Sequence, residues 1–454
     1  MAPLTERLSR WTLITFACAL ANFLLAQALI VLGFTWPSAA LTGGATLAAV
    51  HLVTIGWLTL LMLGALSQFV PVITSRALLD QRLSAAALVL IEVGLVGMVT
   101  GFVTRDMARA PCAWCLVVGG LSVCAGVVLA LVNLATPLLR TRPLPLPGRF
   151  VRAGFLFLIV TMSLGLLFAF TLRASVSSHG PLLHLASGVG YHAIAGVGGW
   201  LTLTAMGVSY KLLSMFMLAP EERGVLGEVV LGLGITGFGL TVAAGLLDLV
   251  WHGSVMILAE RAGWLLIGAS ISAYLADLVR LYRARKRRRI ELHNRAAAGA
   301  FISLAAALVT AAILVISGRA ARVAPPLVVL ALLGWLGGLG LTQLYKVIPF
   351  LSWLTRFGKM IGRGWVPRVQ DLVCEPCAAL WFFLYFAGVW LTVVGAAIET
   401  PLPMRGGAAL STLATLGLSR EYWRAWRGTY VRLPPAVSSH APTIQREDLR
   451  HGHP

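Results

Sequence analysis

The sequence predicts an all-α polytopic membrane protein with about twelve transmembrane helices in three pseudo-symmetric four-helix arcs and both termini in the cytoplasm. Three observations support this fold class. Hydrophobic residues make up 58% of the chain and charged residues only 12%, with a mean hydropathy of +0.85. Apolar runs long enough to cross a bilayer recur along the chain, and lysine and arginine concentrate in alternate connecting segments. Because backbone amides cannot stay unpaired in hydrocarbon, we expect these runs to cross as helices.

The apolar segments mark the expected spans. They cover residues 11–35, 45–73, 85–103, 115–138, 150–172, 184–218, 224–250, 255–279, 296–318, 325–354, 377–398 and 404–419. The first run is too long for a signal peptide and lacks a clear small-residue cleavage site, so we interpret it as the first span. The last run is shorter than the ~20 residues that a span needs, and we expect it to be tilted, shortened or re-entrant.

The formal net charge of +19 reflects membrane topology rather than binding to nucleic acid. The basic stretch from Arg280 to Arg289 lies between two apolar spans, where the positive-inside rule and anionic lipid headgroups account for it. We therefore expect residues 1–433 to form one transmembrane domain in the inner (plasma) membrane of a bacterial cell, in contact with the lipid bilayer. Residues 434–454 are rich in Pro, Ser and His and are expected to form a disordered cytoplasmic tail.

An internal repeat relates three of the spans. The repeats are centred on residues 51–73, 192–216 and 327–351, and they align on Trp57, Trp200 and Trp335, each of which follows a glycine. Further along, the aligned positions hold Ser67-Gln68, Tyr210-Lys211 and Tyr345-Lys346. These are spans two, six and ten, so the pattern predicts three similar arcs whose Gly-Trp helices face a common axis.

This pattern resembles subunit I of heme-copper oxidases, including the cbb3-type and nitric-oxide-reductase branches. That family has twelve helices, cytoplasmic termini, three pseudo-symmetric arcs and metal ligands on helices two, six and ten. The resemblance implies that His51, at the outer end of span two, is a ligand for a heme, here heme b. It also implies that His192, near the outer end of span six, is a ligand for copper. Imidazole suits both metals.

Other ligands of the family are missing from this sequence. Span seven contains no histidine before His252 at its outer boundary, and span ten contains none. The resemblance therefore implies that the oxygen-reducing centre is lost and that the protein is not an active oxidase on its own. A five-coordinate heme, or one with a substitute axial ligand, remains open at His51. The alternative is that His51 and His192 only pack and hydrogen-bond between helices.

Two CxxC pairs offer a second kind of metal site. Cys112 and Cys115 lie on the outer side, where a disulfide is expected, whereas Cys374 and Cys377 lie on the cytoplasmic side, where we expect free thiols. Either pair could chelate a soft cation such as Cu(I). Neither has a second CxxC or histidines nearby, so unconnected interfacial cysteines are an equal interpretation.

Two kinds of charged residue lie inside the expected spans. Glu92 and Asp248 are carboxylates at membrane depth, where they are expected to be protonated, paired or hydrated. A proton path through Glu92 and simple helix-packing hydrogen bonds are both consistent with the sequence. Lys211 and Lys346 occupy the same position in two repeats near the cytoplasmic side, and we expect them to extend toward the headgroups.

Three functions are consistent with these features. We favour a heme-binding or accessory redox subunit of a respiratory or denitrification system, in contact with other subunits of such a complex. The alternatives are a copper transporter or metal-centre assembly protein that uses the cysteine pairs, and a scaffold without cofactors. The sequence holds no nucleotide-binding glycine loop, nucleophile elbow or HExxH motif.

Overall fold

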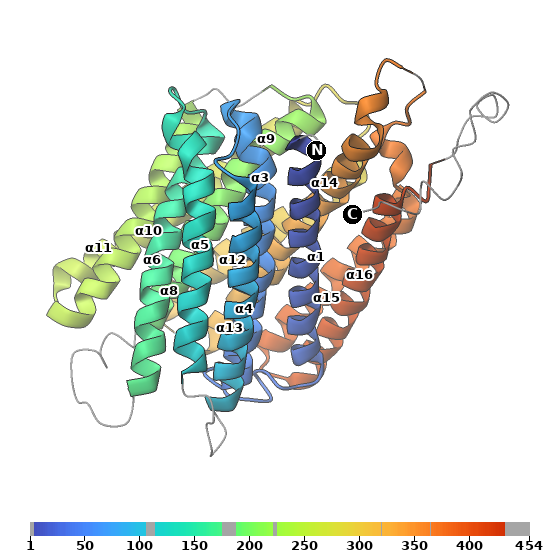
Figure 1. Ribbon diagram of the computed structural model, residues 1–454. Coiled ribbons are helices and arrows are strands. Elements are labelled where there is room, and N and C mark those ends of the chain that lie inside the picture. The colour runs from blue at the N-terminus through green and yellow to red at the C-terminus, as the bar shows by residue number, and fades with distance from the viewer. Residues whose placement is uncertain are drawn as a thin grey trace.

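The computed structural model describes residues 4–105, 114–174, 188–220, 225–318, 320–363 and 365–431, and within these ranges the chain crosses one helical bundle twelve times (Figure 1). The first arc contains α1 (Leu4–Val31), α2 (Gly44–His51) continued by η1 (Leu52–Thr59) and α3 (Leu60–Thr74), α4 (Gln81–Arg105) and α5 (Cys115–Arg140). The second contains α6 (Leu146–Ala174), α8 (Val189–Ala193) continued by η2 (Ile194–Thr202) and α9 (Leu203–Met217), α10 (Val225–Trp251) and α11 (Ser254–Arg283). The third contains α12 (Leu292–Ser317), α13 (Ala320–Val329) continued by η3 (Leu330–Gly337) and α14 (Gly338–Phe357), α15 (Glu375–Ala397) and α16 (Pro401–Arg427). The described part of the chain contains no strand, as the sequence predicted.

The two ends of the bundle differ in charge. Helix α1 begins and α16 ends at the same end, which also carries the basic stretch from Arg280 to Arg289 (Figure 1). We call this the basic end and the opposite one the outer end. Eleven of the twelve segments are long and apolar enough to cross a membrane. An integral membrane protein follows from this count.

The last segment, α16, is longer than the sequence suggested. It is a continuous helix of 27 residues, about 40 Å long at 1.5 Å per residue, although it is not among the eleven apolar spans. The helix continues past the apolar stretch because its polar residues find partners inside the bundle. The hydroxyl of Tyr422 donates to the Leu341 carbonyl at 2.6 Å, and Glu421 is buried. A shortened or re-entrant segment is therefore wrong.

The same π-helical segment interrupts spans two, six and ten. Each π-helix, η1, η2 and η3, contains the Gly-Trp pair of its repeat, and the three segments contact one another in the middle of the bundle. Trp57, Trp200 and Trp335 are 0%, 1% and 1% exposed. The prediction that the Gly-Trp helices face a common axis is confirmed. π-Helical turns inside α-helices are rare and occur frequently at functional sites. Their threefold repetition therefore indicates that the functional site lies beside this centre.

A chain of hydrogen bonds links the three tryptophans. The indole of Trp200 donates to Thr59 Oγ1 at 3.1 Å, and the indole of Trp335 donates to Thr202 Oγ1 at 3.3 Å. Each threonine stands two residues after the tryptophan of its own repeat. The third repeat has Gly337 at that position, and the indole nitrogen of Trp57 has no hydrogen-bond partner among the described residues. We call these three repeats with their Trp-to-Thr hydrogen bonds the tryptophan ring. Two of its three possible hydrogen bonds are formed.

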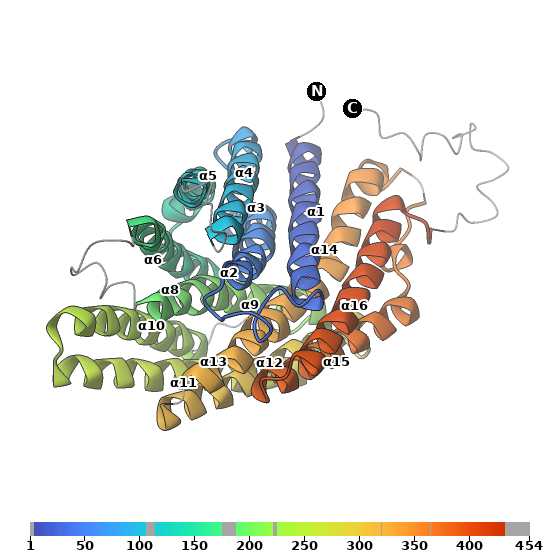
Figure 2. The ribbon, with the colours of Figure 1, turned by 90° about the horizontal axis from the view of Figure 1, so that it is seen from below.

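Each arc also contains one tightly packed hairpin, formed by its last two spans. Figure 2 shows α4–α5, α10–α11 and α15–α16 on three separate sides of the bundle. Glycines make the close approach possible. A Cβ on Gly94 would lie 2.6 Å from the Gly119 carbonyl oxygen, one on Gly237 would lie 2.8 Å from the Ile267 nitrogen, and one on Gly388 would lie 2.6 Å from the Gly407 carbonyl oxygen. These small-residue contacts replace the hydrophobic driving force that helices lack in lipid.

Candidate functional site

A large cavity lies in the outer half of the bundle, beside the three π-helices. It has a volume of about 1550 Å³, above the ~300–1,000 Å³ of ordinary small-molecule sites. Residues from η1, η2 and η3 form its inner wall, and α4, α5, α6, α11, α12 and α13 surround it. Its lining is almost entirely apolar, with both predicted ligands, His51 and His192, among the few polar side chains. The structure thus brings together two histidines that are far apart in sequence.

His51 is the last residue of α2 and sits where the helix changes to the π-helical turn. Its Nδ1 lies 2.8 Å from the Leu47 carbonyl oxygen. Because a carbonyl only accepts hydrogen bonds, Nδ1 carries the proton and Nε2 carries the lone pair. Nε2 has no hydrogen-bond partner among the described residues. The Phe102 ring packs on the imidazole, with the ring centroids 4.8 Å apart, and fixes its orientation.

His192 repeats this arrangement in the second arc. Its Nδ1 lies 3.0 Å from the Thr161 carbonyl oxygen, and the ring packs edge-on against Phe168 with centroids 5.8 Å apart. Gly165 provides the space, because a Cβ at that position would lie 3.1 Å from the imidazole Cε1. The same reasoning leaves the lone pair on Nε2. A carbonyl that holds one imidazole nitrogen while the other stays free is the usual arrangement of a metal-binding histidine.

The described residues do not form a closed metal site. No group of three or more His, Cys, Asp or Glu side chains that could hold a metal ion lies within the described ranges. A heme has a weaker requirement, because the porphyrin supplies four nitrogen ligands and the protein adds one or two axial ligands. A single imidazole in an apolar cavity therefore fits a heme better than it fits an isolated copper ion.

Two arginines lie at the outer rim of the cavity, and the sequence did not single them out. Arg105 ends α4, one helical turn after Phe102, and Arg261 lies in the outer part of α11. Neither has a carboxylate within 4 Å among the described residues, whereas arginines at the basic end do. The sequence shows only that Phe102 and Arg105 are three residues apart and therefore lie on the same face of a helix. This places Arg105 near the cavity only once Phe102 is known to contact His51.

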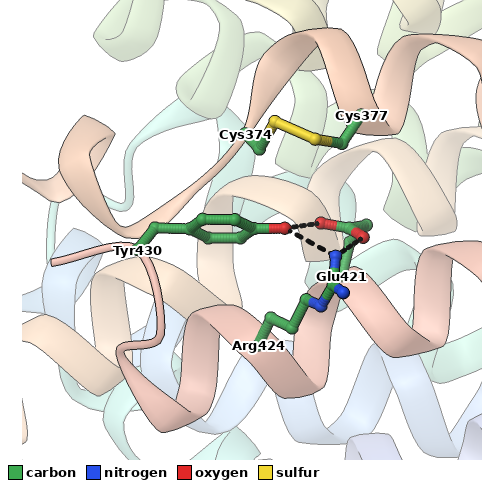
Figure 3. The surroundings of a disulfide bond; sticks show 5 residues. All are labelled: Cys374, Cys377, Glu421, Arg424 and Tyr430. Carbon is green, nitrogen blue, oxygen red and sulfur yellow. Dashed lines mark hydrogen bonds and ion pairs between the residues drawn. A yellow bond between two sulfur atoms is a disulfide. The ribbon is translucent and has the colours of Figure 1, made fainter.

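The described cysteines of the two CxxC pairs do not line this cavity. Cys374 and Cys377 form a disulfide (Figure 3). It lies at the start of α15, which is at the basic end of the bundle. The expectation of free thiols there is wrong for this structure, because the helix start places the two Cα atoms 5.3 Å apart, within disulfide range. Cys115 is also disulfide-bonded, and Cys112 lies outside the described residues. Cys124 of α5 lines the cavity, but none of the three described cysteines of the CxxC pairs does, so these three and the histidines do not form one site.

A charged cluster lies at the basic end, between α12 and α14. Lys346 Nζ donates to Glu291 at 2.5 Å, and Arg287 and Gln370 contact the same carboxylate. The prediction that Lys346 extends toward the headgroups is wrong, because Glu291 offers a nearer partner inside the protein. Burial alone would raise the pKa of Glu291, but the hydrogen bond and charge of Lys346, with Gln370 and His293, lower it below its ordinary value.

Glu92 lies within the first arc. The side-chain amide of Asn22 donates to both carboxylate oxygens, at 3.0 and 3.2 Å, and also reaches the Gly56 carbonyl at 3.4 Å. These bonds connect α1, α4 and η1 at the level of the Gly-Trp motif. The Asn22 amide therefore joins three helices, with Glu92 as its partner on α4, as the packing interpretation of Glu92 requires.

No protein-family model and no curated protein sequence matches the chain. Among solved structures, it is similar to a heme-copper terminal oxidase dimer determined by cryo-EM. The TM-score is 0.59 with 12% sequence identity, over 94% of this chain and 84% of the oxidase chain. At this identity the likeness concerns the fold. With the twelve crossings and the threefold π-helical centre, it establishes that the chain has a heme-copper-oxidase-like transmembrane fold.

Proposed function

We propose that this protein binds heme b in the outer cavity, where His51 would hold its iron, and acts as a heme-binding redox subunit rather than as an oxygen reductase. The observation that carries the proposal is the state of the His51 imidazole. Its Nδ1 is held by the Leu47 carbonyl, its Nε2 is free, and it lines an apolar cavity large enough for a porphyrin. The chain supplies the imidazole ligand, the carbonyl that orients it and the hydrophobic pocket that heme proteins use.

The residues around His51 have complementary roles. Phe102 keeps the imidazole plane in place, and Arg105, one turn further along α4, provides positive charge for the carboxylates of a porphyrin. A bound heme would supply one-electron redox chemistry or reversible binding of a small ligand. The apolar lining keeps water away from such a group and makes its reduction potential depend on the protein.

His192 is the second candidate ligand in the same cavity. Its imidazole has the same free Nε2, so it is available to the heme or to a copper ion. The described residues contain no group of three side chains that could hold a metal ion. Copper at His192 would therefore need further ligands from outside the described residues. For this reason we place heme, and not copper, at the centre of the proposal.

The absence of histidine from span ten argues against oxygen reduction. In heme-copper oxidase subunit I, which this chain resembles, that span supplies ligands for both hemes. The elements η3 and α14 of this chain contain no histidine. We propose an accessory subunit in a bacterial inner membrane, working with other subunits of a respiratory or denitrification system. Copper transport is the alternative, and it requires reduction of the Cys374–Cys377 disulfide before those sulfurs could bind Cu(I).

An optical spectrum with metal analysis tests the proposal. Protein expressed with ample heme and purified in detergent should show a b-type heme band that His51→Ala abolishes. His252→Asn is the matched control, because His252 is exposed outside the cavity and has a positive φ, which asparagine tolerates. A colourless wild-type protein, or a band unchanged in His51→Ala, would refute it.

A further inference from the structure

The outer cavity has a second region that the proposed heme does not explain. Its wall on α11, α12, α13 and η3 carries none of the ligands that iron accepts, since the lining residues of these elements include no His, Cys, Met or Tyr. We propose that this region holds an acyl chain of an anionic phospholipid from the outer leaflet, which enters between α11 and α12 with its phosphate at Arg261. This inference is independent of heme binding.

The cavity opens sideways on this wall. Leu265 of α11 and Ile316 of α12 both line it, yet they are 76% and 86% exposed. Residues that line a closed cavity are buried, so these two mark an opening. The exposed surface of a membrane-spanning helix faces hydrocarbon, and the opening therefore leads into the lipid rather than into water.

Small side chains leave the passage open. Gly268 and Ala269 of α11 face the cavity together with Ala307, Ala311 and Ala312 of α12. A Cβ built on Gly268 would meet only the Leu308 Cδ1 atom, at 3.7 Å, an ordinary contact distance. In the three tight hairpins, glycines such as Gly94, Gly237 and Gly388 allow backbones to touch, whereas Gly268 borders open space. An acyl chain is thin and flexible enough to occupy such a passage and would bury the apolar surface that lines it.

Arg261 supplies the polar part of the site. It lies seven residues after the start of α11, about 10 Å along a helix of about 45 Å. This places its Cα near the boundary between the headgroup region and the ~30 Å hydrocarbon core, from which a long side chain reaches the headgroups. The neighbouring Glu260 is engaged elsewhere, since it accepts the indole hydrogen bond of Trp264 at 3.5 Å. Arg261 has no carboxylate within 4 Å among the described residues. A guanidinium beside an apolar opening matches a lipid phosphate, to which it can donate two hydrogen bonds.

Lipid retention tests this inference. The protein would be reconstituted in vesicles of phosphatidylglycerol and phosphatidylcholine at equal amounts, extracted in detergent, and analysed by native mass spectrometry with and without heme. We expect wild type to keep one phosphatidylglycerol in preference to phosphatidylcholine, and Gly268→Phe, which fills the passage, to lose it. Arg261→Gln should lower the preference about tenfold.

Two controls separate lipid binding from folding. Arg322→Gln removes another outer-end arginine, which is 69% exposed at its side chain and does not line the cavity, and should leave retention unchanged. The thermal unfolding of each variant in lipid-free detergent shows whether the fold is intact. If folded Gly268→Phe keeps the lipid as wild type does, or if the two lipids are retained equally by wild type, the inference is overturned. Neither result depends on whether the heme band is present.

Discussion

The tryptophan ring allows a sharp test of how the centre of this fold is held together. Trp57 and Trp200 are equivalent in the repeat and almost fully buried, so replacement of either by phenylalanine removes a similar volume and apolar area. Their hydrogen bonding differs. Trp200 donates a hydrogen bond to Thr59 at 3.1 Å, whereas the Trp57 indole nitrogen has no partner among the described residues.

The magnitude follows from that difference. A buried hydrogen bond contributes about 1 kcal/mol net, so Trp200→Phe should be about 1 kcal/mol more destabilising than Trp57→Phe, about fivefold in the unfolding equilibrium constant. Trp57 also stacks on Phe23, with ring centroids 4.9 Å apart, and a phenyl ring keeps part of that contact. A double-mutant cycle of Trp200→Phe with Thr59→Val removes this complication and should give a coupling of about 1 kcal/mol.

The assay is reversible unfolding in mixed micelles, followed by far-ultraviolet circular dichroism because the substitutions change the fluorescence. Trp335→Phe with Thr202→Val forms a second cycle with the same expected coupling, since that hydrogen bond is 3.3 Å long. Trp57→Phe with Thr202→Val pairs two side chains that are not hydrogen-bonded to each other and should show coupling near zero. Equal coupling in all three cycles would refute the hydrogen-bonded ring.

Three further predictions concern other parts of the molecule. Gly337→Ser should destabilise rather than complete the ring, because its Cβ would lie 2.9 Å from both the Leu332 carbonyl and the Tyr385 hydroxyl; a gain in thermal stability would contradict this. Gly388→Ala should cost about 1–3 kcal/mol by overpacking, since its Cβ would lie 2.6 Å from a backbone oxygen. Gly406→Ala, with its nearest atom at 4.0 Å, should not destabilise the protein in the same unfolding assay. The folded-state pKa of Glu291 is lowered, so its stabilising effect is complete above the unfolded value of 4.5 and disappears as the pH falls through the folded-state pKa. Thermal unfolding from pH 7 to pH 3 should therefore show a loss of stability in wild type that is smaller in Glu291→Gln, and equal slopes would exclude this role.

Sequence periodicity determined the helical architecture. Apolar runs of bilayer length, with arginines in alternate loops, leave helices as the way to pair backbone groups in lipid, and each of the twelve expected spans is a helical segment in the structure, with α16 the one whose end lies furthest from the expected boundary. The Gly-Trp repeat determined which spans face the axis, because a large aromatic residue repeated beside glycine in three segments needs the same packing three times. The resemblance to heme-copper oxidases, and not the repeat itself, selected His51 and His192, which share a cavity.

Long-range contacts decided the rest. No local pattern states that the Leu47 and Thr161 carbonyls each hold one imidazole nitrogen, that Arg105 and Arg261 share a rim, or that Lys346 finds Glu291. The disulfide at Cys374 depended on the geometry of a helix start, and the length of α16 depended on partners that its polar residues meet in other helices. Hydropathy records how each residue interacts with lipid or water, whereas these features arise from distances between residues far apart in the chain, which only the packed bundle fixes.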